Sequence, residues 1–241
     1  LGLAQVPVVV LDHLTPTQRK AYILADNRLA LDAGWDQEML ALEMAELSEA
    51  GARIARRVAD EFSTPDRPRF VLGSVGPGTK LPTLGHIEAT TIRDGYQTQV
   101  EAMIRGGIDA VQIETCQDLL QAKAAVIAAK RARAAAGIEL PILVNVTVET
   151  TGTMLLGSEI GAALTTLDAL GVDCIGLNCA TGPAEMSEHL RHLARRAKAA
   201  VGAMPNAGLP ELRDNVTVFP LGPEDFAQKT APFAHMGARV L

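Results

Sequence analysis

From residue 52 to its end, the chain alternates short apolar runs with helical stretches, and this rhythm restricts the fold more than any other feature. The apolar runs are continuous rather than alternating, which is typical of parallel strands covered on both faces. The predicted strands are 69–75, 110–115, 141–148, 173–179, 200–205 and 238–241, and the predicted helices are 52–62, 90–105, 117–136, 158–170, 184–199 and 223–236. A spacing of roughly 30–40 residues per strand favours an α/β fold, an incomplete TIM-type (β/α)8 barrel of about six parallel strands. A doubly wound, flavodoxin-like sheet stays open on pattern alone, although no Gly-x-Gly-x-x-Gly follows a strand.

The first 51 residues have a different character. They carry three basic and eight acidic residues, a net charge of −5, whereas the rest of the chain carries −1. A β-branched run at 6–11 predicts a strand, Thr15-Pro16 predicts the start of a helix over 16–31, and Asp36 can cap a second helix. We therefore expect two parts: a small α+β segment over 1–51 and the barrel over 52–241.

Composition excludes several classes of protein. A net charge of −6 lacks the basic field that a nucleic-acid-binding protein usually carries. No apolar stretch approaches the roughly 18 residues that cross a bilayer, and no secretory signal pattern is present, so no membrane partner is expected. Three cysteines are few, and an odd number cannot all pair within the chain, so the sequence argues against a disulfide framework. This favours a reducing, cytoplasmic compartment.

Polar residues and glycines gather directly after the predicted strands. Five residues at these positions are candidates for a ligand site: Gly76, Glu114, Thr147, Asn178 and Asn206. In a TIM barrel the carboxyl ends of the strands meet at one rim, where the chemistry takes place. The alternative is that loops after strands are polar and glycine-rich in any such fold, so the residues alone do not decide between the two.

Cys179 ends a predicted strand and precedes a tight turn into a helix. A thiol near a helix N-terminus has a lowered pKa, which suits a nucleophile or a metal ligand. A lone cysteine is equally often a small buried apolar residue. Cys174 and Cys116 are expected to be structural, and Glu114 either holds a substrate ammonium group or is solvated.

Histidines give no further site. His189 and His192 lie three residues apart on a predicted outer helix, where we expect them to be solvated. The chain contains no His-x-x-x-His or Cys-x-x-Cys spacing, so a complete zinc site is not predicted from its own residues.

Five motifs in order identify a family. GSVGPGTKLPTLG, VQIETCQD, VNVTVETTGTMLLG, IGLNCATGPAEM and PNAGLP together resemble the homocysteine-binding barrel of the cobalamin-dependent methionine synthases, within the zinc-dependent homocysteine S-methyltransferases. The resemblance runs from about residue 52 to residue 241. It implies a methyltransferase in which zinc activates the thiol of homocysteine, which then takes a methyl group and becomes methionine. It also implies methylcobalamin as the donor, carried by a cobalamin module absent from this chain.

The resemblance also assigns roles to particular residues. It implies that Cys179 is the first zinc ligand and that Glu114 contacts the homocysteine amino group. The segments at Gly76, Thr147 and Asn206 match parts that line the site, and Asn178 precedes Cys179 in the same motif, so all four are expected to bind substrate. The family's first two strands, and the Gly-Gly-Cys-Cys-Gly motif that carries the other two zinc cysteines, are not in the sequence. We therefore expect an incomplete zinc site and impaired methyl transfer in this chain.

The segment over 1–51 resembles part of a ParB-type nuclease domain, chiefly through RKAYILADNRLALDAGWD. Two other functions therefore stand beside the methyltransferase. One is a ParB-like nucleic-acid-binding protein, and the other is a non-catalytic interaction protein built on a decayed barrel.

Overall fold

The computed structural model describes Thr15 and residues 37–241. The strand predicted at 6–11 and the helix predicted at 16–31 lie outside the described residues. The chain divides into two compact units, residues 1–40 and 41–241, and every strand described in the structure belongs to the second. The predicted division after residue 51 is not tested by this, and it stays a prediction.

The first described element is one long helix, α2 (Gln37–Phe62), where the sequence predicted two helices separated near residue 51. Gly51 lies inside α2 without ending it, and no proline follows; one ion pair spans the glycine and a second lies further along the helix. Arg53 pairs with Glu49 at 2.6 Å, and Arg56 pairs with Asp60 at 2.8 Å.

Beyond α2 the helices and strands alternate as the sequence predicts. The strands are β1 (Leu72–Val75), β2 (Ala110–Cys116), β3 (Ile142–Val146), β4 (Cys174–Asn178) and β5 (Ala200–Met204). The helices are η1 (Pro82–Leu84), α3 (Ala89–Gly106), α4 (Leu119–Ala136), α5 (Ile160–Leu170), α6 (Pro183–Arg196) and α7 (Pro223–Met236). No helix among the described residues has both the length and the apolar character needed to span a membrane.

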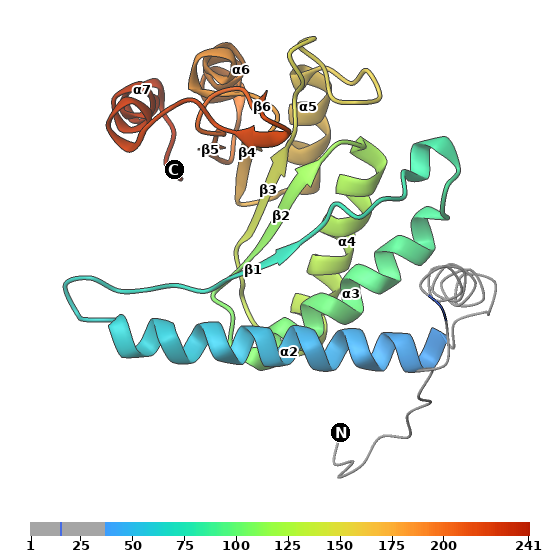
Figure 1. Cartoon of the computed structure of the whole chain (residues 1–241). Helices are drawn as coiled ribbons and strands as arrows, with labels where there is room; N and C mark the ends of the chain where they lie inside the picture. Colours follow the sequence, from blue (N-terminus) through green and yellow to red (C-terminus); the bar gives the residue numbers. More distant parts are fainter. Residues whose placement is uncertain (1–14, 16–36) are drawn as a thin grey trace. The chain divides into compact units, whose positions relative to one another are not determined.

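The five strands form one parallel sheet whose order follows the chain, β1-β2-β3-β4-β5 (Figure 1). Crossovers between parallel strands are right-handed, so connections that always step in the same direction place their helices on one face of the sheet. This arrangement is that of a barrel wall, whereas a doubly wound sheet reverses direction and carries helices on both faces. The predicted sixth strand is reduced to a single parallel bridge, between Val240 and Gly202 of β5.

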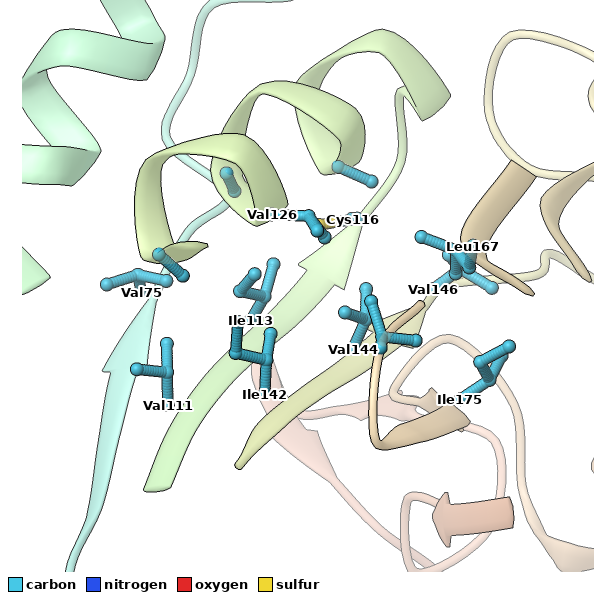
Figure 2. Packing of buried hydrophobic residues seen from close by; sticks show 14 of the residues in the cluster. Val75, Val111, Ile113, Cys116, Val126, Ile142, Val144, Val146, Leu167 and Ile175 are labelled. Carbon is cyan, nitrogen blue, oxygen red and sulfur yellow. The ribbon is translucent and has the colours of Figure 1, made fainter. Parts of the chain in front are cut away.

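The core lies between the sheet and these helices. Val111 and Ile113 of β2 and Ile142 and Val144 of β3 lie on the side of the sheet that faces α4, where Val126 also lies (Figure 2). All five side chains are at most 1% exposed. Burying an aliphatic side chain of this size contributes roughly 1.5–3 kcal/mol, so this layer fixes the face that each strand turns toward the helices. The residues between them in sequence, such as Gln112 and Asn145, therefore face the other side.

A glycine in the left-handed conformation follows most of these helices, where the chain turns toward the next strand. Helices α3, α4, α5 and α7 all end in a left-handed glycine, at Gly107, Gly137, Gly171 and Gly237. Two residues after the glycine, Asp109 and Asp173 accept the backbone N–H groups of Val71 and Ile142, at 2.6 and 2.9 Å. Each aspartate thus ties the start of its own strand to the preceding strand, which fixes the amino-terminal edge of the sheet.

The sequence did not predict an exposed hairpin after β5. Strands β6 (Glu211–Arg213) and β7 (Val216–Val218) pair in antiparallel fashion. Asp214 and Asn215 form the turn between them with φ values of 50° and 59°. Asp and Asn adopt this left-handed conformation more readily than most residues, and a two-residue turn of this kind suits a hairpin.

Candidate functional site

Four of the six predicted site residues meet at the carboxyl ends of three neighbouring strands. Glu114 belongs to β2, Thr147 follows β3, and Asn178 and Cys179 lie at the end of β4. Hydrogen bonds join them into one cluster, which we call the strand-end network. Their positions at the ends of β2, β3 and β4 agree with the expectation that these side chains lie at one rim.

Asn178 is the centre of the strand-end network. Its side chain is 3% exposed, its Oδ1 accepts the backbone N–H of Thr115 at 2.9 Å, and its Nδ2 donates to Oγ1 of Thr115 at 2.8 Å. The Thr147 hydroxyl donates to the Asn178 carbonyl at 3.1 Å. Because Oδ1 faces an N–H group, only one orientation of the amide satisfies both partners. Asn178 therefore joins β2, β3 and β4 at a fixed geometry.

Glu114 presents a carboxylate held from two sides. The Ser74 hydroxyl at the end of β1 donates to Oε1, and Nδ2 of Asn178 lies 3.5 Å from Oε2. The carboxylate is only partly buried, so it keeps lone pairs that can accept further hydrogen bonds. A fixed, partly exposed carboxylate is a suitable partner for an ammonium group.

The backbone beside this carboxylate is unusual. Thr115 and Cys179 both have left-handed backbone conformations, with φ values of 57° and 58°. Such a conformation is rare for a residue other than glycine, and rarest for a β-branched one such as threonine. The Thr115 hydroxyl lies 3.7 Å from Sγ of Cys179, and the Cys179 N–H donates to the Met204 carbonyl at 3.2 Å. Conformations of this kind gather at ligand sites, where surrounding contacts hold them in place.

The three thiols differ in their surroundings. Burial, together with the charges of Asp118 and Glu114, raises the pKa of Cys116 to about 12. Burial and the charge of Asp173 raise the pKa of Cys174 to about 11. Both thiols are therefore protonated at neutral pH, as expected for structural residues, whereas Cys179 is partly exposed. Cys179 is the thiol that a ligand can reach.

Gly76 borders the network through its backbone. Its φ is 93°, and a Cβ atom at this position would lie 3.1 Å from the Glu114 carbonyl. Glycine therefore lets the loop after β1 pass close to the end of β2. A cis peptide bond joins Gly76 to Pro77, whose carbonyl accepts the Tyr96 hydroxyl at 2.9 Å.

Asn206 is connected more loosely. Its backbone N–H donates to the Thr181 carbonyl at 3.1 Å and its carbonyl accepts the Gly208 N–H at 2.7 Å. Its side chain has no hydrogen bond to the strand-end network within the described part of the chain.

Sequence reasoning did not select Ser74 or Thr115 as site residues. In the structure Ser74 alternates along β1 with buried Gly73 and Val75, so it faces the same side as the site. Thr115 directly follows Glu114, but its left-handed backbone has no sequence signature.

The residues 37–241 contain no group of three or more His, Cys, Asp or Glu side chains placed to hold a metal ion. Cys179 is a possible metal ligand, with oxygen and amide donors rather than further thiols as its neighbours.

Comparison with known proteins places this geometry in context. The model of the homocysteine S-methyltransferase family matches residues 30–241. The chain is 62% identical over 188 residues to a methionine synthase of Mycobacterium tuberculosis, a match that covers 78% of this chain and 16% of that protein. It is 60% identical over 194 residues to a methionine synthase of Mycobacterium leprae, covering 80% of this chain and 16% of that protein. The chain thus spans about a sixth of the length of these relatives.

Among solved structures, the metallated form of the homocysteine methyltransferase MmuM from Escherichia coli superposes with a TM-score of 0.64 at 18% identity, covering 81% of this chain and 64% of that one. Its apo form gives a TM-score of 0.60, covering 86% and 68%. At this identity the likeness concerns the fold. The family match begins at residue 30, inside the segment predicted to resemble a ParB-type domain, and these relatives give that resemblance no support.

Proposed function

Because the chain belongs to the homocysteine S-methyltransferase family, we propose that it is the homocysteine-binding module of a cobalamin-dependent methionine synthase. The observation that carries this proposal is the strand-end network, in which a fixed carboxylate and an accessible thiol lie on either side of one buried amide. In the reaction, the sulfur of homocysteine loses its proton and forms a bond to a methyl group, the bond between that methyl group and its donor breaks, and the product is methionine.

The chemistry of homocysteine fits this cluster. Its ammonium group would bind the Glu114 carboxylate, which Ser74 and Asn178 hold in place. A charge-assisted hydrogen bond of this kind is roughly twice as strong as a neutral one. With the amino-acid end bound at β2, the thiol of the substrate would extend toward Cys179 at the end of β4. Thr147 and the backbone at Gly76 and Asn206 would border the bound molecule.

Zinc, when bound, would favour the thiolate form of homocysteine, which is the nucleophile. Cys179 supplies one ligand for such an ion, but the described residues do not complete the usual tetrahedral set. The work proposed for this chain's own residues is therefore binding and positioning of the substrate. We assign the remaining zinc ligands and the methylcobalamin-carrying partner module to other parts of a longer polypeptide, as the length of the relatives allows. A cytoplasmic location fits the three unpaired thiols.

The assignment of Glu114 is tested by calorimetry with two ligands, L-homocysteine and 4-mercaptobutyrate, which lacks only the amino group. In the presence of zinc, the wild-type chain should prefer homocysteine, and Glu114→Gln should remove most of that preference, on the order of 10-fold. The matched control is Glu139→Gln, because the Glu139 side chain is 97% exposed. Equal binding of the two ligands by the wild type, or no binding of either, would contradict the proposal.

A further inference from the structure

A cavity lies on the outer, helical side of the chain and shares no residue with the strand-end network. The loop after β3 and helices α5 and α6 enclose about 570 Å³, within the size range of small-molecule sites. His189 and His192, which we expected to be solvated, are half-buried in its wall. The proposed homocysteine-binding function gives this cavity no role.

Helix α6 gives one wall of this cavity a basic character. It buries Met186, Leu190 and Leu193, and its other side contributes Arg191, Arg195 and Arg196 to the cavity. Glu159 and Glu188 also line the space, yet within residues 37–241 none of the three guanidinium groups forms an ion pair. Unpaired guanidinium groups keep donors that match the oxygen atoms of an anion.

The histidines orient part of this wall. Nη1 of Arg196 lies 2.9 Å from Nδ1 of His192. The same Nη1 lies 3.3 Å from Nε2, and because a guanidinium only donates, the ring is the acceptor in this contact. A Cβ atom at Gly161 would be 3.7 Å from Nε2 of His192, so the ring packs beside the first turn of α5. Arg196 and His192 are thereby held toward the start of that helix.

The start of helix α5 also lines the cavity and offers donors. Helix α5 begins at Ile160, and the preceding Glu159 makes no side-chain capping hydrogen bond. The positive end of a helix and its first N–H groups favour an anion. The hydroxyls of Thr151 and Thr153 lie 3.4 Å from one another at the mouth of the same cavity.

We propose that this cavity is a second ligand site, which binds a small organic phosphate monoester. Guanidinium, imidazole and hydroxyl groups line it together with a helix N-terminus, and all of them donate to phosphate oxygens. The cavity has room for an organic part beside the phosphate, and its concave shape favours a small molecule over a protein surface. The net charge of −6 for the whole chain does not favour a nucleic acid.

The experiment titrates the full chain by calorimetry at constant ionic strength with glycerol 3-phosphate, inorganic phosphate and, as an uncharged control, glycerol. We expect saturable binding of glycerol 3-phosphate and none of glycerol. The double variant Arg195→Ala/Arg196→Ala should weaken binding by about 10-fold or more, because two charged donors are lost. The matched control Arg57→Ala/Arg67→Ala removes two exposed arginines that have no ion pair in the described part of the chain, and it should bind as the wild type does.

A second readout does not depend on the arginine variants. The ring resonances of His192 should shift on addition of glycerol 3-phosphate, while those of His86, outside the cavity, should not. Homocysteine should not displace the phosphate, which separates this site from the strand-end network. No saturable binding by the wild type, an equal loss in both double variants, or equal shifts at His86 and His192 would each overturn the proposal.

Discussion

The Asn178 side chain holds three strands together at the point where the proposed substrate binds. We predict that Asn178→Ala lowers the free energy of unfolding by about 2–4 kcal/mol, because it removes two short hydrogen bonds and leaves the partly buried N–H of Thr115 without its partner. Urea unfolding followed by circular dichroism measures the change. Asn206→Ala is the control, because its side chain makes no hydrogen bond to the network, and it should cost less than about 1 kcal/mol. Equal losses in the two variants would contradict the central role of Asn178.

The buried thiol of Cys116 makes a separate prediction about alkaline pH. Its pKa rises from the ordinary 9.0 to about 12, so between these values the unfolded chain loses a proton that the folded chain retains. Stability is therefore complete below pH 9 and falls as the pH rises toward 12, with a slope of up to ~1.4 kcal/mol per pH unit from this group. Unfolding free energies measured at several pH values should decline less steeply for Cys116→Ala than for the wild type. Parallel declines would show that this thiol ionises in the folded protein.

Among the residues of the site, some positions could be predicted from the sequence and others could not. The positions of Glu114, Asn178 and Cys179 at strand ends follow from periodicity, because the parallel strands of one sheet end at one edge. The link between them does not, since it depends on left-handed backbone at Thr115 and Cys179, and neither residue type favours that conformation. Ser74 lay in a four-residue strand too short for a period of two to be read with assurance.

At the scale of elements, helices α2 and α3 meet at a close contact that depends on glycine. A Cβ atom on Gly106 would collide with Cβ of Ala52 and lie 2.8 Å from the Glu49 carbonyl, whereas a Cβ on Gly51 would meet nothing within 4 Å. We predict that Gly51→Ala raises the unfolding free energy by about 0.5–1 kcal/mol, because it restricts the unfolded chain and favours the helix. Gly106→Ala should instead lower it by about 1–3 kcal/mol, because neither partner can move away freely.

Thermal unfolding of these two variants against the wild type provides the measurement, and each variant is the control for the other. Changes of the same sign would mean that the contact at Gly106 is not close in solution.

Most elements could be predicted because each combines a hydrophobic period with a glycine at its end, as at Gly107 and Gly171. The continuity of α2 could not, because Gly51 suggests a break, whereas the helix runs through it and the Glu49–Arg53 ion pair spans it. Hairpin β6–β7 was missed because its strands have three residues each and almost no buried side chains, so they carry no burial pattern. Asp214-Asn215 was the available signal.

At the scale of the whole molecule, an apolar surface lies beside β1, one of the two edge strands of the five-stranded sheet in the described part of the chain. Phe62, Phe70 and Leu72 are 63%, 67% and 41% exposed and line the same groove. Exposed apolar edges favour association with other chains. We predict that Phe62→Ser/Phe70→Ser reduces concentration-dependent association in light scattering while the unfolding midpoint changes little. Leu155→Ser/Leu212→Ser is the control, because these exposed leucines lie outside this groove, and an equal effect of both pairs would contradict a role for the edge.

The order of the sheet, in which every strand lies beside the strand made just before it, has a consequence for how the protein is made. Among these five strands a ribosome releases β1 before the others, and each of β2 to β5 emerges when the strand that it pairs with has already been made. No strand has to wait for a distant segment, so the loop to be closed at each step is one helix and its connections. Asp109 and Asp173 would then stabilise each new strand during synthesis, since each can bond it to the previous strand as soon as the helix between the two strands has formed. The sheet can therefore grow in one direction at the pace of translation, from β1 toward β5.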